Sequence, residues 1–261
     1  MHHIRCPILI HWNRVAQYQV FSSIDLKYAY HQIPPKDEDK PLTAFEADGG
    51  LYQFKRLPFG VTNGVSCFQR CMNDFISKNN LCGTFAYLDN VFVCGKDASE
   101  HDHHLKLFLD AAKQQNWTFN ESKCEFGTAK LKILGSVIEN GQIFPDPDRL
   151  KPLRELPLPV DAKAMKRTVG LFSYYSKWIP QFSDKIAPLL QAKNFPVEEE
   201  VRIAFEELKN IVASSVVQSV DDSLPFELEC DASDLALAGV LNQNGRPVAF
   251  FSRMLHGSEL P

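Results

Sequence analysis

Residues 85–93 read FAYLDNVFV, so that an Asp-Asn pair separates two short runs of aromatic and β-branched residues. Such runs favour strands, and Asp-Asn favours a tight turn because both side chains can hydrogen-bond nearby backbone. The pattern predicts a β-hairpin over residues 84–93 with the carboxylate of Asp89 at its tip. Taken alone, an ordinary structural turn is the better explanation of the pair.

A second stretch changes this interpretation. Residues 21–33 read FSSIDLKYAYHQI, a strand-like run with Asp25 at the point where the apolar spacing becomes helical. One carboxylate at a strand end and one at a hairpin tip can together hold a pair of hard cations. We expect the carboxylates of Asp25 and Asp89 to lie about 4–7 Å apart, since ions in such sites are about 3.5–4 Å apart.

The two stretches resemble the catalytic motifs of reverse transcriptases of long-terminal-repeat retroelements, most closely the Ty3/gypsy type. The first motif places Asp five residues before an aromatic residue, as Asp25 and Tyr30 do. The second is Tyr-x-Asp-Asp, which reads YLDN at residues 87–90 and so ends in Asn90. Between them, residues 57–63 (LPFGVTN) resemble the nucleotide-pocket motif, although the usual Ala-Pro after it is Gly-Val. Three motifs in the expected order are more specific than any one.

The resemblance implies an RNA-directed DNA polymerase region of a retrotransposon polyprotein. Its partners would be an RNA or DNA template-primer and deoxynucleoside triphosphates, and its cofactor two Mg²⁺ ions, with Mn²⁺ as an alternative. Asp25 and Asp89 would ligate the metal ions. Asn90 would share the catalytic site but leave it one negative charge weaker than the family's usual triad. Loss of that charge is expected to weaken metal binding without abolishing activity.

Other matched residues would shape the substrate sites. By resemblance, Tyr30 would lie beneath the incoming sugar and exclude a ribose 2′-hydroxyl, although a core aromatic residue is the structural alternative. Phe59 and Gly60 would line the nucleotide and template pocket, Gly60 because the backbone must come close. Leu134 and Gly135 resemble the family's primer grip.

The order of expected elements predicts an α+β fold, with an open antiparallel sheet and two helices on one face. In the family this layer is the polymerase palm. We expect residues 18–145 to form the palm with residual fingers, and residues 146–222 to form a helical thumb and connection. Residues 1–17 match poorly and are assigned to an N-terminal remnant or an unrelated segment. The family usually carries a longer basic fingers segment upstream, so we expect the chain alone to be weakly active or inactive.

A basic helix face is predicted within the thumb segment. Asp161 is a good N-cap for a helix with Met165, Val169 and Phe172 on its apolar side. The opposite side carries Lys163, Lys166 and Arg167. Residues 123–193 hold 12 Lys and Arg against 7 Asp and Glu, in a chain whose net charge is -4. This face is a candidate for nucleic-acid binding, with an ordinary solvated surface as an equal alternative.

Residues 225–233 read PFELECDAS, a strand that ends near Asp231 and is followed by two further strand-like runs. The stretch resembles the opening strands of the family's ribonuclease H domain, where the first Asp ligates metal. We assign residues 223–261 to a truncated domain of this kind. Because that fold needs further carboxylates from later helices, Asp231 is expected to be vestigial and the chain to lack nuclease activity.

Composition limits the other classes of function and the cellular location that the sequence allows. The net charge of -4 and a pI near 6.1 argue against nucleic-acid affinity spread over the whole chain. Seven cysteines without paired C-x-x-C spacing suggest reduced, mostly buried thiols of an intracellular protein, cytoplasmic within a virus-like particle or nuclear. A metal tract at His101, His103 and His104 is less favoured than helix packing. The apolar run at residues 7–10 is too short to span a membrane, so no membrane partner is expected.

Two alternatives stay open from the sequence. The chain could descend from a retroelement and be catalytically silent, acting at most as a nucleic-acid-binding or interaction module recruited by its host. The Asn at position 90 is compatible with this view. A small-molecule enzyme with paired carboxylates has no further motif in its favour. Oligomeric state and template preference leave no signal in the sequence.

Overall fold

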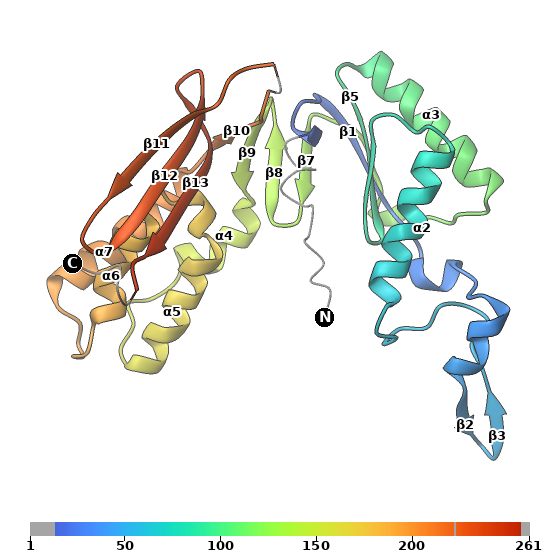
Figure 1. Cartoon of the computed structure of the whole chain (residues 1–261), viewed down its shortest axis with the longest axis horizontal. Coiled ribbons are helices and arrows are strands. Elements are labelled where there is room, and N and C mark those ends of the chain that lie inside the picture. Colours follow the sequence, from blue (N-terminus) through green and yellow to red (C-terminus); the bar gives the residue numbers. More distant parts are fainter. Residues whose placement is uncertain (1–13, 222, 257–261) are drawn as a thin grey trace. The chain divides into compact units, whose positions relative to one another are not determined.

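The computed structural model of the chain describes residues 14–221 and 223–256. Its contacts divide the chain into two units, residues 1–131 and 132–261, which are considered separately below (Figure 1). The predicted segment 1–17 lies mostly outside the described residues. The predicted boundaries at residues 145/146 and 222/223 stay predictions.

The first unit is built on a four-stranded sheet. Its strands are β4 (Thr84–Tyr87), β5 (Asn90–Gly95), β1 (Val20–Asp25) and β6 (Glu125–Thr128), in that spatial order. Each strand is antiparallel to its neighbours. The hairpin predicted over residues 84–93 is therefore confirmed as β4 and β5, and strand β1 separates it from β6.

Two helices, α2 (Gly64–Lys78) and α3 (Ala98–Gln114), pack against one face of this sheet (Figure 1). The contact buries Ile24 and Val91 of the strands against Phe68 of α2 and Phe108 of α3. Because successive side chains of a strand point to opposite faces, burial of Ile24 directs the side chain of Asp25 away from the helices. The predicted α+β layer is confirmed, and it leaves Asp25 outside the core.

Short elements complete the first unit. Residues 27–33, whose sequence predicts a short helix ended by Pro34-Pro35, form a single 3-10 turn, η1 (Ala29–Gln32), and a second turn, η2 (Asp37–Thr43), follows. Residues 42–56 alternate in a way that predicts a hairpin across Asp48-Gly49-Gly50, and this hairpin forms with shorter strands, β2 (Phe45–Ala47) and β3 (Gly50–Tyr52). A 3-10 turn, η3 (Glu121–Lys123), leads from α3 into β6.

The second unit holds two sheets. The first has the order β10-β9-β8-β7 and consists of β7 (Lys130–Ile133), β8 (Ser136–Glu139), β9 (Gln142–Pro145) and β10 (Val217–Gln218). The second is an antiparallel meander of β11 (Glu227–Ala232), β12 (Ala236–Gln243) and β13 (Arg246–Met254). The strand runs predicted near the C-terminus are thereby confirmed.

The helices of the second unit are α4 (Pro147–Arg154), α5 (Ala162–Tyr174), α6 (Phe182–Gln191) and α7 (Glu199–Ser214), with the 3-10 turn η4 (Ser176–Trp178) between α5 and α6. Helix α5 was predicted above, and α7 follows the 3- and 4-residue spacing of Val201, Phe205, Leu208 and Val212 in the sequence. The core between them includes an edge-to-face contact of Phe172 with Phe205. The Asp161 side chain caps α5 by accepting from the Ala164 amide at 2.6 Å. Among the described residues, no helix is long and apolar enough to cross a membrane.

Two sequence expectations about this unit and the cysteines were wrong. The prolines after residue 145, which argue against an uninterrupted element there, do not prevent a helix: Pro147 occupies the first turn of α4, where no amide hydrogen is needed, and the helix also accommodates Pro152. The thiols are not mostly buried. Cys94 is the buried one among the six described cysteines, all of which are free, and Cys67 is exposed although core packing was expected for it.

Candidate functional site

The predicted catalytic residues meet at one end of the first sheet. Strands β1 and β5 pair in a register that places Asp25 directly opposite Asn90. One residue further on, the amide of Leu26 donates a hydrogen bond to the carbonyl oxygen of Asp89 at 2.8 Å. Paired residues of antiparallel strands present their side chains on the same face. The fold thus brings the backbone of Asp25, Asp89 and Asn90 together from stretches 64 or more residues apart in the sequence, and the separation of 4–7 Å expected between the two carboxylates stays a prediction.

The turn that carries Asp89 is tight. Tyr87 pairs with Asn90, so Leu88 and Asp89 alone form the connection between β4 and β5. Leu88 has a φ of 53°, a conformation that costs free energy for a residue with a branched side chain. Such a turn persists only if neighbouring groups hold it.

Gln69 of helix α2 supplies this support. Its Oε1 accepts from the Leu88 amide at 2.9 Å, and its Nε2 donates to the Ala86 carbonyl at 2.9 Å. The same Nε2 lies 3.0 Å from Oδ1 of Asn73 on the next helical turn. Sequence reasoning missed Gln69, because a half-buried Gln on an amphipathic helix carries no pattern that separates it from ordinary surface residues.

The donor set suits a hard divalent cation in part. Asp25 and Asp89 offer carboxylate oxygens and Asn90 an amide oxygen, which are ligand types that Mg²⁺ and Mn²⁺ accept. The Asn90 Nδ2 lies 3.4 Å from the Asp89 Oδ1, a long contact in which the amide faces the carboxylate. Among the described residues, no group of three His, Cys, Asp or Glu side chains could hold a metal ion. The replacement of a carboxylate by Asn90 is consistent with that result.

The residues expected to form the nucleotide pocket also lie together. The ring of Tyr30 stacks on Phe68 with centroids 5.1 Å apart and contacts Phe59 at 5.3 Å. Phe59 is 67% exposed, so this aromatic cluster reaches from the core to the surface. Gly60 has a φ of +85° with open space where a Cβ would be, which fits a backbone that a ligand approaches.

The predicted primer-grip residues belong to the second unit. Leu134 and Gly135 form the two-residue turn between β7 and β8, with φ of 47° and 82°. A Cβ on Gly135 would come within 3.2 Å of Tyr174 Oη and of the Arg149 side chain. This turn therefore lies against the C-terminal end of helix α5.

Helix α5 carries the predicted basic face. Lys163, Lys166 and Arg167 are all exposed. One turn further along the same side is Gly170, where a Cβ would meet no atom within 4 Å, and then Tyr174, which is 57% exposed. Packing within the unit does not require glycine in the middle of this helix, where it costs about 1 kcal/mol relative to Ala. Sequence reasoning passed over Gly170 and Tyr174.

Other titratable groups are less suited to chemistry. Asp231 on β11 is exposed, and its Oδ2 accepts from Gln181 Nε2 at 2.9 Å. Its assignment as a vestigial metal ligand stays a prediction. Burial raises the pKa of the Cys94 thiol, which keeps it protonated and unreactive. Burial lowers the pKa of Lys177 to about 8, so this lysine adds less than a full charge near α5 at neutral pH.

The support from Gln69 can be tested by replacing it with Ala. The Leu88 amide then loses its acceptor, so its hydrogen exchange should accelerate, and the free energy of unfolding should fall by about 1–3 kcal/mol. Gln69→Glu keeps the acceptor for Leu88 but places an oxygen against the Ala86 carbonyl, so it should preserve protection of Leu88 and still lose stability. The exposed neighbour Arg70→Ala is the control. Unchanged Leu88 exchange in Gln69→Ala would contradict this account.

Solved structures resemble this fold. A foamy viral protease-reverse transcriptase bound to an RNA/DNA hybrid aligns with a TM-score of 0.77 and 21% sequence identity, over 92% of this chain and 34% of that one. The same kind of protein bound to double-stranded DNA aligns with a TM-score of 0.78 and 21% identity, over 93% of this chain and 52% of that one. At this level of identity the likeness concerns the fold, and it confirms the predicted fold class.

Curated sequences are similar over nearly the whole chain. The retrovirus-related Pol polyprotein from transposon 297 of Drosophila melanogaster is 34% identical over 95% of this chain. The corresponding polyprotein from transposon gypsy is 32% identical over 92%. The Tf2-7 polyprotein of Schizosaccharomyces pombe is 28% identical over 92%. The chain spans 24%, 25% and 19% of the lengths of these three relatives.

Two family models match the chain. Residues 197–261 match the RNase H-like domain found in reverse transcriptase. Residues 3–138 match the reverse transcriptase (RNA-dependent DNA polymerase) model, a match that includes most of the segment 1–17. The motifs around Asp25 and Asp89 lie inside this match, and their Ty3/gypsy-like character agrees with the gypsy and Tf2 relatives. This chain is a reverse transcriptase region of a retrotransposon polyprotein and belongs to the reverse transcriptase (RNA-dependent DNA polymerase) family.

Proposed function

We propose that this chain supplies the nucleotidyl-transfer site of an RNA-directed DNA polymerase, which extends a primer 3′-hydroxyl with deoxynucleotides on an RNA or DNA template. One observation carries the proposal. The antiparallel register sets Asp25 opposite Asn90, and the Leu26 amide bonds the Asp89 carbonyl at 2.8 Å. This backbone pairing supports a site in which the two carboxylates come close enough to share divalent cations.

In this proposal Asp25 and Asp89 hold Mg²⁺ or Mn²⁺. The bound ions would favour deprotonation of the primer hydroxyl and neutralise charge on the leaving pyrophosphate. Asn90 would contribute an amide oxygen but no negative charge, so binding of the ions should be weaker than at a site with three carboxylates. The contact of Asn90 Nδ2 with Asp89 Oδ1 would hold the carboxylate in place before the ions bind.

The aromatic cluster would select the nucleotide. The ring of Tyr30 contacts those of Phe59 and Phe68, and this packing would resist its displacement by an extra hydroxyl on the sugar. Steric exclusion of the 2′-hydroxyl distinguishes deoxyribonucleotides from ribonucleotides at that atom. Exposed Phe59 and the open backbone at Gly60 are suited to contact with bases or sugar.

The second unit would hold the nucleic-acid backbone. Lys163, Lys166 and Arg167 supply the charge for phosphate contacts. Gly170 would allow close approach of a strand to helix α5, and exposed Tyr174 would offer an apolar surface with a hydroxyl. Tyr174 adjoins the turn at Gly135, so the basic face and the proposed primer grip form one continuous surface within this unit.

Substitution of the carboxylates tests the catalytic assignment. Primer extension on an RNA template is measured for two proteins. One is the 261-residue chain, and the other is this chain joined to the upstream polymerase segment of a relative such as the gypsy polyprotein. Asp25→Asn and Asp89→Asn should each lower the rate by about 100-fold or more, the cost of removing one charge-stabilising group. Asn90→Asp should change the rate or the preference between Mg²⁺ and Mn²⁺ modestly.

Three outcomes of this assay differ in meaning. Extension that survives both Asp→Asn substitutions would contradict the assignment. If the unaltered site is inactive in the joined form and Asn90→Asp alone restores extension, the site has decayed and the chain is a silent remnant. Robust extension by the 261-residue chain without any added segment would show that its own residual fingers are sufficient for polymerase activity.

The basic face is tested by the salt dependence of duplex binding. Replacing Lys163, Lys166 and Arg167 together by Ala should reduce the slope of log K against log salt by up to about three counterions. The matched control replaces three exposed lysines on or beside helix α3, namely Lys96, Lys106 and Lys113. An unchanged slope in the α5 variant, or an equal loss in the control, would assign the face to plain solvation.

A further inference from the structure

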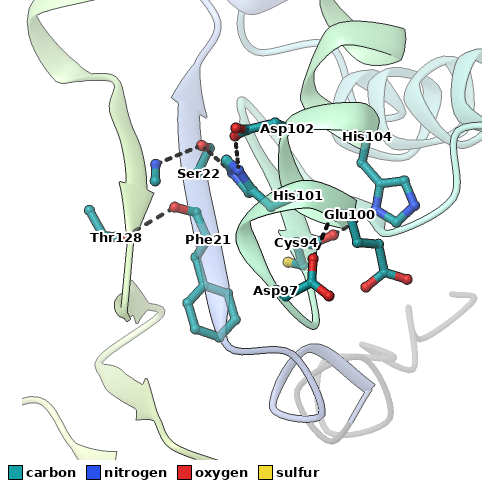
Figure 2. Close-up of polar contacts among 10 residues, drawn as sticks. Phe21, Ser22, Cys94, Asp97, Glu100, His101, Asp102, His104 and Thr128 are labelled. Atoms are coloured by element: carbon teal, nitrogen blue, oxygen red, sulfur yellow. Dashed lines mark hydrogen bonds and ion pairs between the residues drawn. The ribbon is translucent and has the colours of Figure 1, made fainter.

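A buried polar cluster lies on the side of strand β1 that faces helix α3 (Figure 2). Ser22, three residues before Asp25, is 0% exposed, and His101 in the first turns of α3 is 1% exposed. Neither residue has a role in the proposed chemistry. Burial of polar groups is costly unless each is hydrogen-bonded, so the partners of these side chains define what the cluster does.

The cluster is a directed chain of hydrogen bonds. His101 Nδ1 lies 2.9 Å from Asp102 Oδ1, and His101 Nε2 lies 2.8 Å from Ser22 Oγ (Figure 2). The Gly127 amide donates to the same Ser22 oxygen at 3.1 Å. Since an ionised carboxylate can only accept, Nδ1 carries a proton. With that proton on Nδ1 alone, Nε2 accepts from the Ser22 hydroxyl and every group has a partner.

The arrangement has the residue types of a hydrolytic triad but not its accessibility. Ser22 is fully buried, and its oxygen already accepts from Gly127. A nucleophilic serine must reach a substrate carbonyl, which this one does not. The cluster therefore acts on the structure rather than on a substrate.

Its effect falls on the pairing of β1 with β6. Phe21 pairs with Thr128 and Ser23 with Glu125, so Phe126 and Gly127 together face Ser22 alone. This irregularity is a β-bulge, which leaves a backbone amide without its ladder partner. Ser22 accepts that amide's hydrogen bond. The Ser22 hydroxyl, itself held by His101, thus determines where along β1 the bulge occurs.

The position of the bulge also sets which residues pair with β1 at its catalytic end. The segment before β6 continues alongside β1, where the Asn120 amide donates to the Asp25 carbonyl at 2.8 Å and Phe119 forms a bridge with Leu26. A shift of one residue in pairing would turn each partner to the opposite face of the sheet. The backbone of Asp25 is therefore held on this edge by a register that the bulge sets.

Helix α3 gives the cluster a fixed anchor. A Cβ on Gly95 would lie 2.2 Å from the His101 amide nitrogen, so only glycine allows the helix to lie this close to β5. His104, one turn later, donates from Nδ1 to the Cys94 carbonyl at 2.8 Å. The Asp97 side chain caps the helix by accepting from the Glu100 amide. His101 is thereby held against the strand that pairs with β1.

We propose that Ser22 and His101 are positioning residues, which fix the register between β1 and β6 and so hold the backbone of Asp25 from that edge, while the regular pairing of β1 with β5 places Asp25 opposite Asn90. The assignment rests on the proposed function because it concerns the same carboxylates. It requires a proton on Nδ1 of His101, which Asp102 accepts, and the contact of Nε2 with Ser22 Oγ. Asp102 orients the ring, and Gly127 is the backbone group whose pairing is set.

Two histidine substitutions separate the two ring nitrogens. His101→Gln places an amide oxygen near the position of Nε2 and can still accept from Ser22, whereas His101→Asn keeps only the position of Nδ1. The readouts are hydrogen exchange of the Leu26 amide, which bonds the Asp89 carbonyl, and binding of Mn²⁺ to the 261-residue chain. His101→Asn and Ser22→Ala should accelerate Leu26 exchange beyond the loss of global stability. Both should weaken Mn²⁺ binding, by up to about tenfold, the lower end of the loss seen when direct supports of metal ligands are removed.

His101→Gln and the exposed neighbour His103→Asn should both remain near the unaltered chain. If Ser22→Ala and His101→Asn accelerate exchange at Gly127 but leave Leu26 exchange unchanged, the cluster acts only locally and the proposal is overturned. The substitution Asp25→Asn separates the test of the metal site from the test of the positioning role. If it leaves Mn²⁺ binding intact, the proposed metal site is contradicted, while Leu26 exchange still decides the positioning role.

One further measurement uses the unaltered chain, so its result does not depend on whether a variant folds. The ¹⁵N resonances of the His101 ring report which nitrogen carries the proton. A neutral ring with Nδ1 protonated and Nε2 free is the expected result. A neutral ring with its proton on Nε2 would overturn the proposal, because Nδ1 would then have no proton to donate to Asp102.

Discussion

The pairing of strand β1 with the β4–β5 hairpin is the constraint on which the candidate site depends. The bond from the Leu26 amide to the Asp89 carbonyl joins two motifs that are far apart in the sequence. A strand that slips by one residue exchanges its buried and exposed faces, so this register is enforced by burial of Ile24 against the helices. The same burial leaves Asp25 on the opposite face, where it is free to bind a ligand.

Polar side chains on the helix-facing side reinforce this register from two helices. Gln69 of α2 bonds the strained turn at Leu88, and His101 of α3 bonds Ser22 of β1. His101 is buried and Gln69 half-buried, and a buried polar group left unpaired would cost about 1–3 kcal/mol. Apolar contacts tolerate small shifts, whereas hydrogen bonds are directional. We infer that these polar contacts fix what the hydrophobic core alone would leave adjustable.

The sequence predicted the parts of this fold that depend on local pattern. The hairpin around Asp89 and helices α2, α3, α5 and α7 follow from apolar periodicity and turn chemistry. Helix α4 was missed because proline counts obscured its favourable first turn at Pro147. The contacts of Gln69 and His101 could not be predicted, since they depend on which strand backbone a helix lies against. That information is tertiary and has no short-range signal in one sequence.

Crystals of the chain bound to a template-primer and soaked in Mn²⁺ offer the most direct test of the central claim, that Asp25 and Asp89 jointly hold the catalytic cations. Anomalous scattering from manganese locates the ions without assumptions about their ligands. The account predicts two peaks about 3.5–4 Å apart, with carboxylate oxygens of both residues as ligands. Manganese bound away from Asp89, or ligated by Asp231 alone, would contradict it.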